Sequence, residues 1–181
     1  MIGPVVSDAP TIFTLGHSVH SADAFITLLN AHGIRHLADV RLIPGSRRHP
    51  HFSREALPTL LAPHGVSYQH FPDLGGRRRP RADSVNTAWR VDAFRGYADY
   101  MASRPFVDAV DRLLELAQTA PTAVMCAEAK WWQCHRRLLA DALVAGGVPV
   151  LHILSAAAPK PHELSEFASV ADRRVTYPGL I

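Results

Sequence analysis

The densest group of reactive side chains in the sequence lies in its last third. The group consists of Cys126, Glu128, Cys134, His135 and Arg136. A thiolate is a nucleophile, a glutamate can act as a general acid or base, and an arginine can bind a phosphate or carboxylate through paired hydrogen bonds. A helix beginning here would add free N–H groups and a dipole that favour an anion and lower a thiol pKa. The cluster therefore predicts a thiolate nucleophile or an anion cradle.

The same residues also have structural and metal-binding interpretations. Cys126 ends an apolar segment and can be a small buried hydrophobic residue, while Glu128 can simply pair with an arginine. Zinc sites usually contain closely spaced cysteine pairs, whereas seven residues separate Cys126 from Cys134 and only His135 adjoins them, with His17 as a fourth ligand from elsewhere. A metal is therefore possible but not favoured, and no organic-cofactor motif occurs, so the cofactor stays unknown.

Two other segments contribute candidate site residues. Asp39 and Arg41 flank one residue of a strand end, so both point to the same face and can form an ion pair or contact a substrate. His17 and Ser18 follow Gly16, which allows a tight turn or the close approach of a ligand. His17 is interpreted equally well as a local cap or as a catalyst.

Arginine dominates the basic residues, since 17 of the 19 are Arg. Between residues 41 and 95 there are ten arginines against four acidic residues, so the formal net charge of +3 conceals one basic segment. Its loops are interleaved with aromatic residues, a pattern that suits an anionic small molecule or a nucleic acid, although a solvated surface is the other interpretation. The candidate substrate-binding residues here and nearby are Arg47, Arg48, Arg77, Arg78, Arg95, Tyr97 and Trp132.

These residues need a fold that brings them together. Apolar segments predict strands at 11–15, 34–40, 66–71, 123–126 and 148–154, with a short strand or edge at 175–177. Helical patterns lie between them, at 21–33, 53–61, 94–101, 105–116 and 134–145, and residues 77–91 predict a long surface loop. This alternation predicts an α/β three-layer sandwich with a mainly parallel central sheet flanked by helices. Its ligand crevice would lie at the carboxyl ends of the strands.

Length and composition set the broad class. With 181 residues, 48% apolar and 19% charged, the chain predicts one α/β domain over 11–181 with an N-terminal extension at 1–10. Two cysteines cannot form a multi-bridge framework, and there is no signal-peptide pattern or long apolar run. We therefore expect a cytoplasmic protein with no membrane partner; the oligomeric state is left open.

Several motifs together resemble one family. They are Thr14-Leu15-Gly16-His17-Ser18, Ala38-Asp39-Val40-Arg41, Pro44 to Arg48, Phe94 to Met101, Met125 to Glu128 and Cys134-His135-Arg136. In this combination, collinear over 11–154, the sequence is similar to the domain-of-unknown-function family DUF488. The resemblance implies a single α/β domain without an established activity; some members carry a DNA-repair label.

A separate similarity is to rhodanese-like and cysteine-phosphatase domains. These have an Asp-Val-Arg strand end, as at Asp39 to Arg41, and a later strand running into a cysteine loop, as at Val124 to Cys126. They wrap about six residues around an anion, whereas the segment from Cys126 to Arg136 is longer and has no glycine to open its backbone N–H groups. The sequence therefore does not favour that kind of loop.

Three functional hypotheses follow. The preferred one is an enzyme that acts on an anionic substrate, such as a nucleotide or a modified or damaged nucleic acid, through the Cys/Glu/His/Arg cluster. The second is a thiol-based sulfur-transfer or redox enzyme, which requires a cysteine with a lowered pKa. The third is a nucleic-acid-binding module without catalysis.

Overall fold

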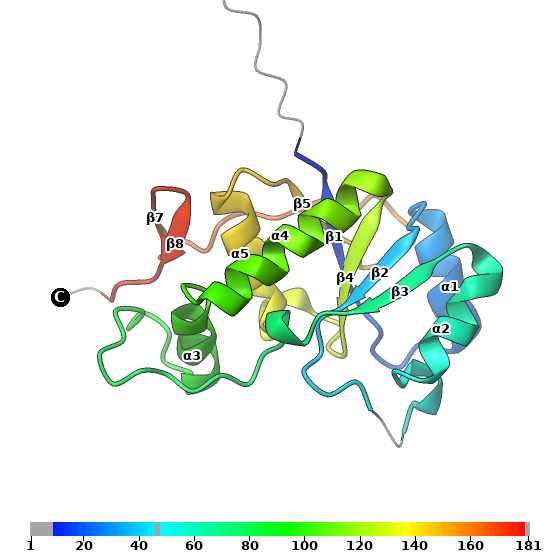
Figure 1. Cartoon of the computed structure of the whole chain (residues 1–181), viewed down its shortest axis with the longest axis horizontal. Helices are drawn as coiled ribbons and strands as arrows, with labels where there is room; N and C mark the ends of the chain where they lie inside the picture. The colour runs from blue at the N-terminus through cyan, green and yellow to red at the C-terminus, as the bar shows by residue number, and fades with distance from the viewer. Residues whose placement is uncertain (1–8, 46–47, 180–181) are drawn as a thin grey trace, which may run out of the picture.

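The computed structural model describes residues 9–45 and 48–179, and strands and helices alternate along most of this range (Figure 1). The strands are β1 (Ile12–Gly16), β2 (His36–Asp39), β3 (Ser67–His70), β4 (Thr122–Cys126), β5 (Val150–His152), β6 (Lys160–Pro161), β7 (Ser169–Ala171) and β8 (Arg174–Thr176). The helices are α1 (Ala22–Ala31), α2 (Ala56–Leu61), α3 (Asp92–Tyr100), α4 (Arg104–Thr119) and α5 (Arg136–Ala145). Short 3-10 turns lie at Pro50–Phe52, Ala62–His64, Pro72–Leu74 and Trp131–Gln133.

The central sheet of the described residues has the strand order β3-β2-β4-β1-β5-β6. All neighbours pair in parallel except β5 and β6, which are antiparallel. β4 lies in the middle and is buried along its whole length, as expected for a strand covered on both faces. The fold class predicted from the sequence is confirmed.

Helices cover both faces of the sheet and define two apolar cores. On one face α1 and α2 pack on Leu15, Leu37 and Met125, and on the other α3, α4 and α5 pack on the alternate strand residues. Figure 1 shows α1 and α2 lying together, away from α4 and α5. The alternation follows from the strand period of two, which sends neighbouring side chains to opposite faces. The result is the predicted three-layer arrangement.

The sheet has a switch point between β1 and β4. The chain leaves β1 into α1 on one face and leaves β4 into α5 on the opposite face, so the two connections diverge at the carboxyl ends of adjacent strands. Ligand crevices of open α/β sheets form at such points. The residues after these strands, from His17 and from Ala127, are those that the sequence selected as candidates.

Element boundaries and the tail differ in places from the sequence-based prediction. α5 begins at Arg136 rather than Cys134, β5 covers only Val150–His152, and the strand expected at 175–177 is β8, which pairs with β7 outside the main sheet. Residues 77–91 lack helix and strand as predicted, but Asn86 and Trp89 in this segment are buried. Most of the predicted N-terminal extension lies outside the described residues. No helix in the described ranges is both long and apolar enough to span a bilayer.

A buried polar network fixes the C-terminal segment to α5. Asp141 accepts hydrogen bonds from His162 at 2.8 Å, from the Ser165 hydroxyl at 2.8 Å and from the Tyr177 hydroxyl at 2.8 Å. His162 in turn contacts His152, which contacts the Thr14 hydroxyl on β1. Burial opposes ionisation, but these hydrogen bonds lower the pKa of Asp141. The carboxylate therefore joins the sheet, α5 and the tail.

We expect Asp141→Ala to destabilise the protein by about 3 kcal/mol, because several buried donors would lose their acceptor. The free energy of unfolding from chemical denaturation measures the change. The matched control is Asp111→Ala on exposed surface of α4, which should change it by less than about 0.5 kcal/mol. Equal effects of the two substitutions would contradict the role of the network.

Candidate functional site

A cavity of about 660 Å³ opens at the switch point, at the carboxyl ends of β1 and β4. The sequence-predicted residues that line it are His17, Ser18, Arg41, Arg48, Arg77, Cys126, Glu128, Cys134 and His135. They come from segments far apart in the sequence and meet here because parallel strands end at one edge. Of the predicted catalytic residues, Cys126, Glu128, Cys134, His135 and His17 therefore share one cavity, whereas Asp39 is buried behind its lining.

The two cysteines form the floor of this cavity. Cys126 is the last residue of β4 and Cys134 immediately precedes the first turn of α5, and their Sγ atoms lie 3.3 Å apart. The Cys126 Sγ is also 3.0 Å from Oε2 of Glu128. The single thiol proton of Cys126 can therefore be donated to the sulfur of Cys134 or to the Glu128 carboxylate.

Arg136 places a buried positive charge beside these sulfurs. Its side chain is 1% exposed, Nε donates to Sγ of Cys134 at 3.3 Å, and Nη2 donates to the carbonyl oxygen of Glu128. Among residues 9–45 and 48–179, no carboxylate forms an ion pair with Arg136. A buried guanidinium needs a compensating anion, and the sulfur that it contacts is the group able to supply one.

The surroundings shift the pKa values of the two thiols in opposite directions. The hydrogen bond from Cys126 and the charge of Arg136 lower the pKa of Cys134 to about 7, against the effect of burial. Burial and the hydrogen bond to Cys134 raise the pKa of Cys126 well above its usual range. For Glu128, burial would raise the pKa, but the hydrogen bond from Cys126 and nearby positive charges lower it. Near neutral pH Cys134 is therefore the thiol of the two that ionises, beside a neutral Cys126 thiol and a Glu128 carboxylate.

His135 lies against the wall of the cavity as a neutral imidazole. Burial lowers its pKa to about 4, and its Nε2 donates to the carbonyl oxygen of Val40 at 3.1 Å, which leaves Nδ1 as an acceptor. A Cβ atom at Gly76 would lie only 3.0 Å from this Nδ1. The glycine therefore leaves room for the ring.

Asp39 and Arg41 form the predicted ion pair, which is buried. Arg41 donates from Nε and Nη2 to the two carboxylate oxygens, at 2.8 and 2.6 Å, and from Nη2 to the Phe52 carbonyl at 2.7 Å. Tyr68 also donates to Asp39. Because most donors of Arg41 are used internally, the pair contributes mainly the shape and charge of the wall.

His17 is held between this pair and the backbone. Its Nε2 accepts from Nη1 of Arg41 at 3.2 Å, its Nδ1 donates to the Ser18 carbonyl at 3.0 Å, and its ring stacks on Phe52. Burial and the Arg41 charge lower its pKa to about 4. Both nitrogens are occupied, which is closer to the local-cap interpretation than to the catalytic one.

The cavity mouth carries two exposed cations, Arg48 and Arg77. Within the described part of the chain neither forms an ion pair, so their donors remain available to an anion. Arg77 has a φ of 60°, a left-handed backbone conformation that is uncommon for an arginine. Arg47, another predicted anion-binding residue, lies outside the described residues.

Gly16 allows the loop after β4 to approach β1. A Cβ atom at this position would overlap the carbonyl oxygen of Glu128, the same oxygen that accepts from Arg136. A side chain here would therefore displace the backbone that carries the cluster. The sequence associated Gly16 with a tight turn or with the approach of a ligand. In the structure the space beside Gly16 is filled by the backbone of Glu128 and Ala129.

Among the described residues, five predicted substrate-binding residues do not line the cavity, and one of them is the buried Arg136 described above. Arg78 lies over the Tyr100 ring, and Arg95 pairs with Asp92. Tyr97, expected as a stacking surface, has no exposed surface and donates to the Leu74 carbonyl. Trp132 is 41% exposed but is packed against Trp131 and Lys130. Of the aromatic residues in the basic segment, Phe52, Phe71 and Trp89 are likewise buried, whereas Phe94 lines the cavity.

The same cluster has the donor set of a metal site. The ligand atoms of Cys126, Glu128 and Cys134 all lie within 4.8 Å of one another. Two sulfurs, one carboxylate oxygen and an open side toward the cavity fit a zinc ion of the catalytic type. Neither His135 nor His17 belongs to this group of mutually close ligand atoms, so among the described residues the Cys/Cys/His set considered from the sequence is not formed.

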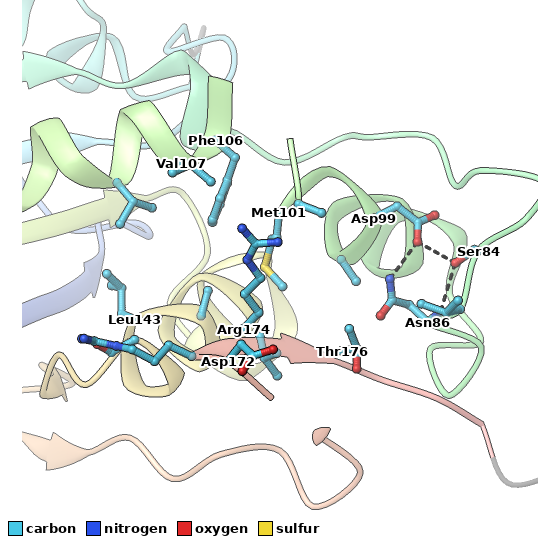
Figure 2. Close-up of a pocket in the computed structure, with 18 of the residues that line it drawn as sticks. Ser84, Asn86, Asp99, Met101, Phe106, Val107, Leu143, Asp172, Arg174 and Thr176 are labelled. Carbon is cyan, nitrogen blue, oxygen red and sulfur yellow. Dashed lines mark hydrogen bonds between the residues drawn. The ribbon is translucent and has the colours of Figure 1, made fainter. Parts of the chain in front are cut away.

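A second cavity, of about 690 Å³, shares no lining residue with the first (Figure 2). It is formed between α3, α4, α5 and the β7-β8 hairpin, with apolar walls such as Met101, Phe106 and Leu143. The Asp99 carboxylate at its edge is bonded to Ser84 and Asn86. It contains neither cysteine nor histidine, so we place the reactive chemistry in the first cavity.

Sequence reasoning missed two groups of residues. The buried histidines of the Asp141 network, His152 and His162, were not singled out by the sequence; the aspartate on the apolar face of α5 was the available signal. Val19 and Ile43 are exposed apolar residues at the cavity mouth that no sequence pattern singled out. The network matters to the site because His152 stacks on Trp131, in the loop that carries Cys134.

Comparison with known proteins gives one match. The model of the family described as "Domain of unknown function DUF488" matches residues 21–143. No curated protein matches the chain. No solved structure matches it either.

We expect Cys134 to be alkylated by iodoacetamide with a midpoint near pH 7, below the value of about 8.5 for a free cysteine. Cys126 should stay unmodified at the same pH. Arg136→Met should raise the Cys134 midpoint by about one pH unit or more, because the compensating cation is lost, whereas Arg136→Lys keeps it. Rates from peptide mass spectrometry measure this. An ordinary midpoint in the wild type would contradict a Cys134 thiolate.

Proposed function

The chain belongs to the DUF488 family, whose description assigns no function, and from its site we propose an enzyme that acts on a phosphate-bearing substrate with Cys134 as its nucleophile. The substrate class is a nucleotide or a modified or damaged nucleic acid. The reaction class is nucleophilic attack by a thiolate on an electrophilic atom of the bound anion.

One observation carries the proposal: the buried guanidinium of Arg136 contacts Sγ of Cys134 at the floor of a cavity. A purely structural cysteine would not need this partner, and a purely structural buried arginine would have a carboxylate instead. The arrangement stabilises a thiolate at a point that a ligand can reach. This is the situation in which cysteine becomes reactive.

The other residues fit subsidiary roles. Nδ1 of His135 is an acceptor at the cavity wall and can accept a hydrogen bond from a substrate group or a water molecule, which orients that group. The Glu128 carboxylate can hold the proton of Cys126 and keep that thiol neutral beside the thiolate. The Asp39–Arg41 pair and His17 define the opposite wall.

The preference for an anion rests on the cavity mouth. Arg48 and Arg77 are exposed there, and planar guanidinium groups suit phosphate oxygens. A thiolate repels an anion, so the substrate must bind with its charge at the mouth and its reacting atom toward the floor. The basic segment between residues 41 and 95 extends this positive field beyond the cavity.

A sulfur-transfer or redox enzyme is the second candidate, favoured by the 3.3 Å contact between Cys126 and Cys134. This second function would use the same Cys134 thiolate as the proposed enzyme acting on a phosphate-bearing substrate. A nucleic-acid-binding module without catalysis is less well supported, because Phe52 and Trp89 in the basic segment and Tyr97 just after it are buried and are not available for base stacking.

We expect adenosine monophosphate and a short single-stranded oligonucleotide to bind at this cavity and to slow the alkylation of Cys134. Arg48→Gln and Arg77→Gln should each weaken binding about tenfold, equivalent to about 1.4 kcal/mol. The matched control Arg104→Gln removes an exposed arginine on α4 and should leave affinity unchanged. Calorimetric titration at two salt concentrations measures the affinities.

The results separate the candidates. Binding that protects Cys134 and that requires Arg48 and Arg77 supports the enzyme. Salt-dependent oligonucleotide binding that leaves Cys134 alkylation unchanged would indicate the binding module instead. No anion binding, with Arg48→Gln and Arg77→Gln equal to the wild type, would overturn the proposed substrate class.

A further inference from the structure

The two sulfurs at the cavity floor are placed for a second kind of chemistry. Cys126 and Cys134 are both free thiols with their Sγ atoms 3.3 Å apart. A disulfide bond is about 2.05 Å long, so the sulfurs need to approach by little more than 1 Å. Cys126 is fixed at the end of β4, whereas Cys134 belongs to the connection before α5, most of whose residues from 127 to 133 are exposed.

We infer that Cys126 and Cys134 form a reversible intramolecular disulfide, in which Cys134 reacts first with a hydroperoxide and Cys126 is the resolving thiol. The inference rests on the proposed function only in using the same Cys134 thiolate. It assigns to Cys126 a chemical role beyond that of a neutral neighbour.

The first step is attack of the Cys134 thiolate on one oxygen of the hydroperoxide. A sulfur–oxygen bond forms, the oxygen–oxygen bond breaks, and the leaving oxygen takes a proton from solvent, so a sulfenic acid and an alcohol or water result. Cys134 lines the cavity, which a small uncharged peroxide can enter. Arg136 keeps the attacking sulfur anionic until this step.

The second step uses Cys126 and Glu128. The Cys126 thiol gives its proton to the Glu128 carboxylate, 3.0 Å away, and its sulfur attacks Sγ of Cys134. The sulfur–sulfur bond forms, the sulfur–oxygen bond breaks, and the departing hydroxide takes the proton from Glu128 and leaves as water. Overall, two thiols and one hydroperoxide give one disulfide, one alcohol and one water, so the peroxide is reduced and the thiols are oxidised.

The buried arginine makes this oxidation reversible. In the disulfide neither sulfur carries a charge, so the guanidinium of Arg136, which is 1% exposed, loses the thiolate in contact with it and keeps only the charge of Glu128, with which it forms no ion pair. Weaker compensation of a buried charge destabilises the oxidised form relative to the reduced form. A dithiol pair whose reduced form is stabilised is readily reduced back by another thiol. Oxidation therefore removes the nucleophile of the site temporarily.

The test begins with the reduced full-length protein and an equimolar amount of hydrogen peroxide. In the wild type we expect both thiols to disappear together, a Cys126–Cys134 link in peptide mapping, and full recovery with dithiothreitol. Cys126→Ser should stop at the sulfenic acid, which dimedone traps on Cys134. Cys134→Ser should leave the Cys126 thiol unmodified. Glu128→Gln should prolong the lifetime of the sulfenic acid in the presence of Cys126.

A second resolving-thiol variant, Cys126→Ala, guards against a folding defect in Cys126→Ser, and circular dichroism checks each protein. A persistent sulfenic acid on wild-type Cys134, or links between molecules only, would overturn the inference. A third contradicting result is also defined. If the purified protein holds zinc through both sulfurs, and if no disulfide forms after the zinc is removed, the inference is overturned.

The outcome is separable from that of the proposed function. Adenosine monophosphate binding to the reduced wild type tests the anion site without peroxide. A disulfide with no anion binding would contradict only the proposed substrate class. Anion binding that protects Cys134, with no disulfide, would contradict only the resolving role of Cys126.

Discussion

The buried guanidinium of Arg136 is the constraint on which the site depends. It donates to the Glu128 carbonyl and to the Cys134 sulfur, and so fixes both ends of the connection between β4 and α5. The same carbonyl occupies the space that Gly16 leaves open on β1. Because a charge in this environment must be compensated, the geometry that holds the loop also favours the ionised form of Cys134. Local structure and reactivity therefore have one physical cause.

A second buried charge supports the opposite wall. Asp39 and Arg41 satisfy each other at the end of β2, and Arg41 extends the arrangement to His17 at the end of β1. The two walls meet where the connections of β1 and β4 leave the sheet on opposite faces, so the fold itself opens the space between them. The structural charges, Arg41 and Arg136, lie within the walls, whereas Arg48 and Arg77 at the mouth remain available to a ligand.

The region around Asp141 links the cavity to the rest of the molecule. Its network includes His152, whose ring is parallel to that of Trp131 at a centroid distance of 4.0 Å. Trp131 also provides the carbonyl that accepts from the Cys134 backbone N–H. The C-terminal segment, held through Tyr177, thus contributes to the placement of the reactive sulfur although it lies far from it in the sequence.

By itself the sequence determined the fold class, the parallel sheet and most of the titratable side chains that line the cavity. Apolar periodicity and the rule that ligands bind at carboxyl strand ends use local information. His17 and Arg41 follow predicted strands, Cys126 ends one, and Cys134 begins a predicted helix. The tertiary structure alone decided which side chains are committed to packing. In the folded protein Tyr97 is buried and donates to a backbone carbonyl, and both ring nitrogens of His17 form hydrogen bonds. Arg136 contacts a sulfur rather than a carboxylate. Such pairings depend on residues that are distant along the chain, so burial and charge compensation became visible only once the chain was folded.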